Sequence, residues 1–417
     1  MSKVTVRNAD VRMRGFSGRT LVEDALAWID THTVPLPSKS TGLDALRGRI
    51  LAVDMRSTMN VPAFDRSAMD GYALRGAESV GASNYNPLSF TICGQSMPGQ
   101  PYVGTVLPGT AVRIMTGAPL PEGADAVLPA EYAQEISGCV QITSPIAPGK
   151  HVGRMGEDVT EGSVVLAAGR TLRAQDVGLL ASIGIAQAEV IRRPRISILA
   201  TGNELVTPGT VKGLHQIYDS NSSMLRGLCE RDGAEVIEQL HLEDDREQIR
   251  QAMLKPEADV VLISGGSSVG SEDHAPTLLA ELGELAVHGV AMRPSSPVGF
   301  GRIGNTLVFL LPGNPVSCLC AYDFFAGRAI RRLGARRTEW PYAQTQETLS
   351  RKIVSAVGRV DYCRVRRIDG GVEPIALSGA AILSSTSRAD GFVIVPAASE
   401  GYAPGQSISV YHYDPAY

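Results

Sequence analysis

Short apolar runs alternate with helical patterns between residues 194 and 334 of this chain. The predicted strands occupy residues 196–200, 235–242, 260–263, 285–292 and 307–311. The runs at 260–263 and 307–311 are almost unbroken, as in strands buried on both faces. The stretches between them repeat apolar residues at helical spacing, at residues 222–230, 246–254, 276–282 and 316–333. Strands that alternate with helices predict a mostly parallel sheet covered by helices on both faces.

Several of these predicted helices carry boundary signals. Asp219 and Ser220 precede the helix at 222–230 and are candidates to cap it, and Gly233 follows it. Gly283 and Gly334 end the helices at 276–282 and 316–333 in the same way.

The rest of the chain has different patterns. Leu21, Ala25, Trp28 and Ile29 recur at helical spacing and predict a helix over 20–30. Glycine and proline are frequent from about 60 to 150, and the short apolar runs at 90–93, 111–115 and 126–128 predict a β-rich domain. A strand at 164–167 and a helix at 174–183 follow, and short strands with turns after about 341 predict a small all-β carboxy-terminal domain.

Length and composition narrow the class of protein. A chain of 417 residues is too long for one compact core and predicts two to four domains. Its net charge of -4 gives no electrostatic basis for binding nucleic acid. No apolar run approaches the roughly 20 residues of a membrane helix, and the first ten residues lack the apolar core of a secretory signal. We therefore expect a cytoplasmic protein.

The six cysteines do not suggest a metal site. They form no Cys-x-x-Cys pair and have no accompanying cluster of histidines, which argues against zinc. Reduced thiols in a cytoplasmic protein are the preferred interpretation.

Two strands are followed by glycine loops, at residues 258–270 and 307–317. A glycine loop beside the start of a helix can offer backbone N–H groups to a phosphate. The spacing matches neither the P-loop nor the dinucleotide-binding fingerprint. Ordinary tight turns are the alternative interpretation of either loop alone.

Acidic residues follow three consecutive predicted strands. Glu204 follows the first, residues 243–245 follow the second, and residues 272–273 follow the third. Ligands of open α/β sheets bind beyond the carboxyl ends of the strands, so we expect these carboxylates to meet at one edge. Oxygen ligands beside a phosphate suit Mg²⁺. Alternatively, single acids such as Asp245 and Glu272 are helix caps or solvated surface carboxylates.

Six segments in a fixed order connect the chain to a known family. They occupy residues 62–73, 113–121, 156–159, 201–205, 264–273 and 311–317. In these segments the chain resembles the bacterial molybdopterin molybdenumtransferases, the MoeA family, which is related to the carboxy-terminal domain of gephyrin.

The resemblance implies a multidomain fold of α/β and β type. It comprises an elongated linker domain formed by 1–60 and 150–192, and a β-rich inserted domain at 61–149. A three-layer αβα molybdopterin-binding domain at 193–338 and a β-barrel domain at 339–417 follow. The family forms dimers, with the active cleft between the α/β domain of one subunit and the second domain of the other.

The activity that the resemblance implies is part of molybdenum cofactor biosynthesis. Adenylylated molybdopterin and molybdate would give the cofactor and AMP in a Mg²⁺-dependent transferase reaction. The expected partners are small-molecule substrates, a second copy of the chain and the upstream molybdopterin adenylyltransferase, with neither nucleic acid nor membrane.

Family positions then assign roles to individual residues. The catalytic candidates are Asp70, Thr116, Asp158, Glu204, Asp244 and Asp273, of which Glu204, Asp244 and Asp273 would hold the metal. The substrate-binding candidates are Ser264, Gly265, Gly266, Ser267, Ser268, Arg293, Pro312, Gly313, Asn314 and Pro315. Local alternatives remain: Asp70 and Thr116 could serve only as turn residues, and Asp158 could serve as a partner of Arg154.

The chain departs from the family at basic positions. Gly153, Gly289 and Ser296 stand where family members carry cations. Arg302, His288 and Arg359 are the candidates to compensate. Because the acids and glycine loops persist while cations are missing, the alternative function is a non-catalytic or weakly active paralogue that binds molybdopterin or its nucleotide as a carrier or scaffold.

Overall fold

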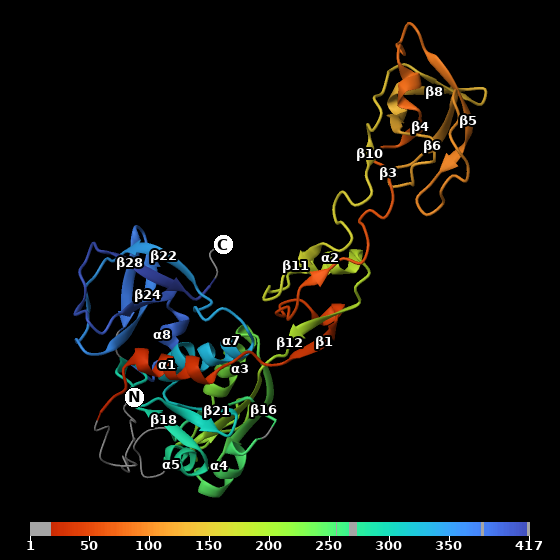
Figure 1. Cartoon of the computed structure of the whole chain (residues 1–417). Helices are drawn as coiled ribbons and strands as arrows, with labels where there is room; N and C mark the ends of the chain where they lie inside the picture. Colours follow the sequence, from red (N-terminus) through yellow and green to blue (C-terminus); the bar gives the residue numbers. More distant parts are fainter. Residues whose placement is uncertain (1–17, 256, 267–272, 377–378, 415–417) are drawn as a thin grey trace, which may run out of the picture. The chain divides into compact units, whose positions relative to one another are not determined.

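The computed structural model describes residues 18–255, 257–266, 273–376 and 379–414. The chain forms two compact units (Figure 1): residues 40–190 form one, and residues 1–39 together with 191–417 form the other. Among the helices of the described segments, none has the length and hydropathy that a membrane span requires. The four-domain boundaries proposed from the sequence remain a prediction.

A six-stranded sheet forms the centre of the larger unit. Its strands, in spatial order, are β16 (Glu235–Leu242), β13 (Arg195–Thr201), β17 (Val260–Ser264), β21 (Thr306–Leu311), β20 (Gly299–Ile303) and β18 (Glu284–His288). The first four are parallel, and β20 and β18 run antiparallel to their neighbours. The mostly parallel sheet predicted from the sequence is therefore confirmed.

Helices cover both faces of this sheet. One face packs on α1 (Val22–His32), α3 (Asn221–Arg231), α6 (Pro315–Ala321) and α7 (Gly327–Leu333). The other face packs on α4 (Arg246–Met253) and α5 (Ala275–Leu282). Val260 and Leu262 of β17 join the first core, whereas Val261 and Ile263 join the second. Both faces being buried explains why the central strands β17 and β21 are almost continuously apolar, whereas the edge strand β16 keeps exposed polar residues.

The predicted elements differ from the observed ones in three places. The strand expected at 285–292 ends at His288 as β18, because Gly289 follows with φ +88°, and Met292–Arg293 form β19 in another sheet. The helix expected at 316–333 is present, but its middle turn, Tyr322–Ala326, is a π-helical segment between α6 and α7. Strand β20 was not predicted because its glycines break the apolar pattern. A Cβ on Gly301 would lie 1.7 Å from the carbonyl oxygen of Glu284, so no side chain fits there.

The carboxy-terminal segment forms the expected β-domain. Its main strands are β22 (Ala343–Thr348), β24 (Val360–Ile368), β25 (Gly371–Ala376), β26 (Gly391–Val395) and β28 (Ser407–His412), and β19 (Met292–Arg293), from earlier in the chain, pairs with β24. A short pair, β23 (Ile353–Val354) with β27 (Gly401–Tyr402), and helix α8 (Ser384–Ser387) complete it. Tyr362 and Phe392 belong to the same core as α3 and α7, so this domain and the α/β domain share apolar packing.

The smaller unit contains a second six-stranded sheet with its own core. Its spatial order is β7 (Ala126–Pro129), β4 (Gly71–Leu74), β6 (Thr110–Ile114), β5 (Leu88–Ser96), β9 (Cys139–Ile142) and β8 (Ala133–Ile136). The remaining elements are the pairs β1 (Ser38–Gly42) with β12 (Gln187–Ile191), β2 (Met55–Arg56) with β11 (Val164–Leu166) and β3 (Arg66–Ser67) with β10 (Val152–Gly153), and helix α2 (Ala174–Ser182). A separate core around Leu51, Leu172 and Leu180 lies outside the six-stranded sheet.

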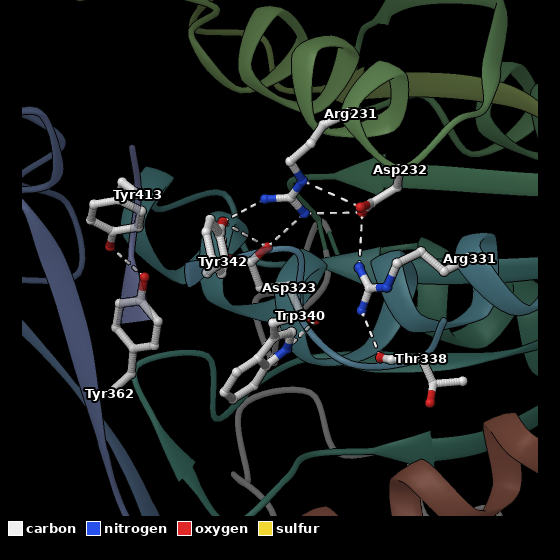
Figure 2. A network of polar contacts seen from close by, with 9 residues as sticks. All are labelled: Arg231, Asp232, Asp323, Arg331, Thr338, Trp340, Tyr342, Tyr362 and Tyr413. Carbon is white, nitrogen blue, oxygen red and sulfur yellow. Dashed lines mark hydrogen bonds and ion pairs between the residues drawn. The ribbon is translucent and has the colours of Figure 1, made fainter. Parts of the chain in front are cut away.

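A buried charge network connects helix α3 to the carboxy-terminal domain (Figure 2). Arg231 forms ion pairs of 3.0 Å with Asp232 and with Asp323, and it donates a hydrogen bond of 2.5 Å to the hydroxyl of Tyr342. Arg331 of α7 also pairs with Asp232, at 3.0 Å. Burial acts to lower the pKa of Arg231, but Asp323, Tyr342 and Asp232 outweigh burial and raise it, so the guanidinium stays charged.

We expect Arg231→Met to destabilise the larger unit by about 3–5 kcal/mol, because two buried carboxylates would lose their shared cation. Urea unfolding followed by tryptophan fluorescence measures this change, since Trp28 and Trp340 both lie in this unit. The matched control is Arg226→Met on the same helix, where an exposed arginine lies 4.0 Å from Glu230 and the expected change is within about 0.5 kcal/mol. Equal effects of the two substitutions would show that the buried ion pairs of Arg231 do not contribute more to stability than the exposed pair of Arg226.

Candidate functional site

A pocket of about 600 Å³ opens at the carboxyl ends of the parallel strands. Strand β13 lies between β16 and β17, so the chain order reverses direction at β13, and this switch point is where open α/β sheets bind ligands. The predicted site residues that line the pocket are Glu204, Asp244, Asp273, Ser264, Gly265, Gly266, Pro312, Gly313, Asn314 and Pro315. The structure thus brings the three acid clusters and both glycine loops to one place.

The glycine loops allow the strand ends to approach each other closely. Gly265 has φ +100°, and a Cβ there would lie 2.4 Å from the carbonyl oxygen of Thr201. A Cβ on Gly313 would lie 3.6 Å from the Cα of Gly265. The amide of Gly265 donates to Leu311 O at 3.2 Å, so this N–H holds the two loops together and is not free for a ligand.

The three candidate metal ligands lie on three different loops around the pocket. Asp244 Oδ2 accepts from the amide of Asn203 at 3.2 Å, and Asn203 Oδ1 accepts from the amide of Asp244 at the same distance. The Glu204 carboxylate folds over Gly202, where a Cβ would lie 2.8 Å from Oε2. Asp273 Oδ1 would lie 3.9 Å from a Cβ on Gly266.

These carboxylates do not form a metal cage by themselves. Within the described ranges, no group of three or more His, Cys, Asp or Glu side chains is placed to hold a metal ion. Magnesium sites usually combine one or two carboxylates with phosphate oxygens and water. The metal assignment of Glu204, Asp244 and Asp273 therefore stays a prediction.

Neighbouring polar residues have capping roles. Asp245 Oδ1 accepts from the amide of Gln248 at 2.8 Å and caps α4, which confirms the structural alternative for this acid. Asp219 Oδ1 accepts from the amide of Ser222 at 3.0 Å, as expected, whereas Ser220 makes no side-chain cap. Ser267, Ser268 and Glu272 lie outside the described residues.

Arg293 lies in an adjoining cavity of about 330 Å³. This cavity shares Pro297, Pro312 and Asn314 with the first pocket. Arg293 donates to Asp361 Oδ2 at 2.5 Å, and Asp361 is buried. The buried carboxylate of Asp361 therefore neutralises part of the positive charge of Arg293. Sequence reasoning missed Arg364, a second arginine of this cavity, because its position follows only from the packing of β24.

The structure shows that Arg302, proposed to compensate for the missing cations, lies away from the pocket. Arg302 pairs in register with Leu307, at the amino end of β21, and forms an ion pair of 2.9 Å with Glu284. It therefore lies at the opposite edge of the sheet from the pocket. Arg359 forms an ion pair of 3.0 Å with Asp361, close to Arg293.

One of the departures from the family, Gly289, has a backbone conformation that favours glycine, whereas at Gly153 the close atoms belong to flexible side chains. A Cβ on Gly153 would lie 2.9 Å from Glu157 Oε1 and 3.4 Å from the side chain of Arg66. Gly289 has φ +88°, a conformation that favours glycine. The Arg66 side chain thus lies against the position where the family cation is missing.

Asp70 and Thr116 are paired within the smaller unit. The amide and the hydroxyl of Thr116 both donate to Asp70 Oδ1, at 2.7 Å each. The backbone hydrogen bond, followed by that of the hydroxyl, lowers the pKa of the Asp70 carboxyl. Arg154 pairs with Asp65 at 2.6 Å, rather than with Asp158 as the local alternative proposed.

Fold and pocket together define a multidomain protein built around a doubly wound α/β domain with a ligand pocket at its switch point. Three family models match successive parts of the chain. The MoeA N-terminal region (domain I and II) matches residues 20–184, the "Probable molybdopterin binding domain" matches 197–332, and the MoeA C-terminal region (domain IV) matches 346–413.

Relatives match over most of their length. A molybdopterin molybdenumtransferase of Haemophilus influenzae is 32% identical, with 90% of this chain and 95% of that protein covered. Molybdopterin molybdenumtransferase 2 of Mycobacterium tuberculosis is 37% identical, with 69% and 73% covered. The crystal structure of the molybdopterin biosynthesis MoeA protein of Pyrococcus horikosii has a TM-score of 0.82 at 31% identity, with 96% of this chain and 100% of that chain covered. The chain belongs to the MoeA family.

We expect Thr116→Val to raise the pKa of Asp70, because the substitution removes one of two hydrogen bonds to the ionised carboxylate. Since the folded pKa is lowered, the stability contributed by this pair is present above the unfolded pKa of Asp70. It is lost as the pH falls through the folded pKa. Carboxyl NMR titration of the full chain measures the shift. Thr116→Ser keeps the hydroxyl and is the control; a Val variant with the wild-type pKa would show that the hydroxyl has no influence.

Proposed function

We propose that this transferase of molybdenum cofactor biosynthesis inserts molybdate into adenylylated molybdopterin and releases AMP in a Mg²⁺-dependent reaction. Family membership supports the reaction class. The observation that carries the proposal is that Glu204, Asp244 and Asp273 line the same pocket as both glycine loops. Carboxylates and close backbone beside one another suit a metal-bound phosphate.

The charge of the pocket supports the need for a divalent cation. The acids that line it are Glu204, Asp219, Asp244 and Asp273, and its described lining includes no Lys, Arg or His. A nucleotide phosphate would meet only like charges there. The oxygen-only donor set fits Mg²⁺. Bound there, Mg²⁺ would neutralise phosphate charge and polarise the bond to the departing AMP.

The adjoining cavity suits the second anionic substrate. Arg293 and Arg364 line it, together with Ser295 and Ser296, and the Ser295 hydroxyl donates to Ser317 O. Arg293 Nε and Ser296 Oγ are buried and have no hydrogen-bond partner among the described residues. Both are donors, and hydrogen bonds from such donors favour an oxyanion such as molybdate. We propose that this cavity holds molybdate beside the phosphate-binding loops.

The second set of candidates would act in a dimer. We propose that Asp70 and Thr116 of the second domain approach the nucleotide bound to a partner copy, with Asp158 of the linker domain as a further candidate, in the arrangement that the family resemblance implies. The lowered pKa of Asp70 keeps its carboxylate ionised at neutral pH. An upstream adenylyltransferase would supply the substrate, and we propose that both proteins act in the cytoplasm.

We expect Glu204→Gln and Asp273→Asn to lower molybdate-dependent AMP release about 100-fold, because each removes a charge that would bind the metal, while the melting temperature changes little. The assay gives purified protein adenylylated molybdopterin, Mg²⁺ and molybdate, and follows AMP. Asp245→Asn is the matched control, since Asn also caps helices well and Asp245 does not line the pocket.

The same assay separates the two candidate functions. If Glu204→Gln and Asp273→Asn both turn over substrate at the wild-type rate, the metal assignment is refuted. Wild-type protein that binds the nucleotide tightly without molybdate-dependent AMP release would instead support a carrier. The partnered charge of Arg293 and the missing cations at Gly153, Gly289 and Ser296 are the observations that favour the carrier.

We further expect AMP to bind at least about tenfold more weakly when EDTA replaces Mg²⁺, because the phosphate would then face four carboxylates without a cation. Isothermal titration calorimetry of AMP measures the change. Adenosine, which lacks the phosphate, is the control and should bind equally under both conditions. Equal AMP affinity with and without Mg²⁺ would contradict a metal-bridged phosphate.

A further inference from the structure

We infer that Asn221 is a positioning residue that holds the two glycine loops of the pocket in register. The inference rests on the proposed function, because it concerns the same site. Asn221 is the first residue of α3 and lies in the pocket lining. Its Nδ2 donates hydrogen bonds of 2.8 Å to Ser264 Oγ and 2.8 Å to Gly313 O.

The two acceptors belong to different loops. Ser264 ends β17 and directly precedes Gly265 and Gly266, whereas Gly313 lies in the loop between β21 and α6. A single amide group therefore links the start of α3 to both loops. Since the carbonyl oxygen of Gly313 can only accept, the nitrogen of the Asn221 amide must face it, and this determines the orientation of the side chain.

The link is shielded from water. Asn221 is 8% exposed and Ser264 is 3% exposed, so water competes little for these hydrogen bonds. Ser264 Oγ also lies 3.9 Å from Cys318 Sγ, which extends the contact to helix α6. An aspartate at 221 would place a carboxylate oxygen against Gly313 O and would remove both donated hydrogen bonds without changing the size of the side chain.

Positioning matters because backbone amides act on a phosphate only at short range. Site geometry must hold within about 0.5 Å, and a misplacement of about 1 Å can cost roughly 100-fold in rate. The Gly265 amide, which donates to Leu311 O, reports on the same region. If Asn221 holds the loops, its loss should loosen this hydrogen bond as well as weaken the site.

The test compares Asn221→Asp and Asn221→Ala with the wild-type chain. We expect faster amide hydrogen exchange over residues 264–266 and 313–314 without ligand, AMP affinity at least tenfold lower with Mg²⁺ present, and a kcat at least tenfold lower. A role in stability alone would lower the melting temperature and leave AMP affinity and kcat of the folded protein unchanged. If Asn221→Asp does not fold, Asn221→Ala decides by the same measurements.

Asn86→Asp is the matched control, because Asn86 also donates through Nδ2 to a carbonyl, that of Gly81 at 3.0 Å, but in the smaller unit. It should leave exchange, AMP affinity and kcat within twofold of wild type. AMP affinity within twofold of wild type in both Asn221 variants overturns the inference. If the wild-type chain itself binds no AMP, the proposed function fails, and exchange in the ligand-free variants alone decides whether Asn221 holds the loops.

Discussion

Close approach of three strand ends is the constraint on which the site depends. The Cα of Gly265 lies against the carbonyl oxygen of Thr201, where any Cβ would be only 2.4 Å away, and the loop of Gly313 lies against Gly265. Side chains would push β13, β17 and β21 apart at this edge. The glycines of these loops therefore line the pocket together with the acids of the neighbouring loops. Gly265, with φ +100°, would be strained as any other residue even if space were made for it.

The regular part of this arrangement follows from the sequence, because burial on both faces leaves a direct signal. Continuous apolar runs predicted β13, β17 and β21, and the rule that ligands bind beyond the carboxyl ends of parallel strands brought Glu204, Asp244 and Asp273 together. Strand β20 was not predicted, because at Gly301 the neighbouring backbone lies too close for a side chain, and a glycine leaves no apolar signal in the sequence. Its antiparallel direction also explains the error with Arg302, because strand direction has no signal in the residue pattern.

Side-chain partners distant in sequence were beyond prediction for another reason. A capping residue such as Asp219 acts on an amide three positions away, so its role can be predicted locally. Asn221, two residues later, acts on Ser264 and Gly313, and nothing near it in the chain indicates these acceptors. The pair of Arg293 and Asp361 likewise forms only because β19 and β24 lie side by side.

The larger pocket is lined by carboxylates and the smaller cavity by arginines, and this difference matters for the positions where family cations are missing. In the larger pocket, four carboxylates and no described cation mean that, under the proposed function, a phosphate would need a metal ion to bind. In the smaller cavity, Arg293 and Arg364 carry the positive charge, and Asp361 offsets part of it. A buried guanidinium with a fixed partner is already oriented, which lowers the entropic cost of binding an oxyanion. Ser296 lines this smaller cavity, so under the proposed function a cation missing there would weaken the affinity for molybdate more than that for the nucleotide.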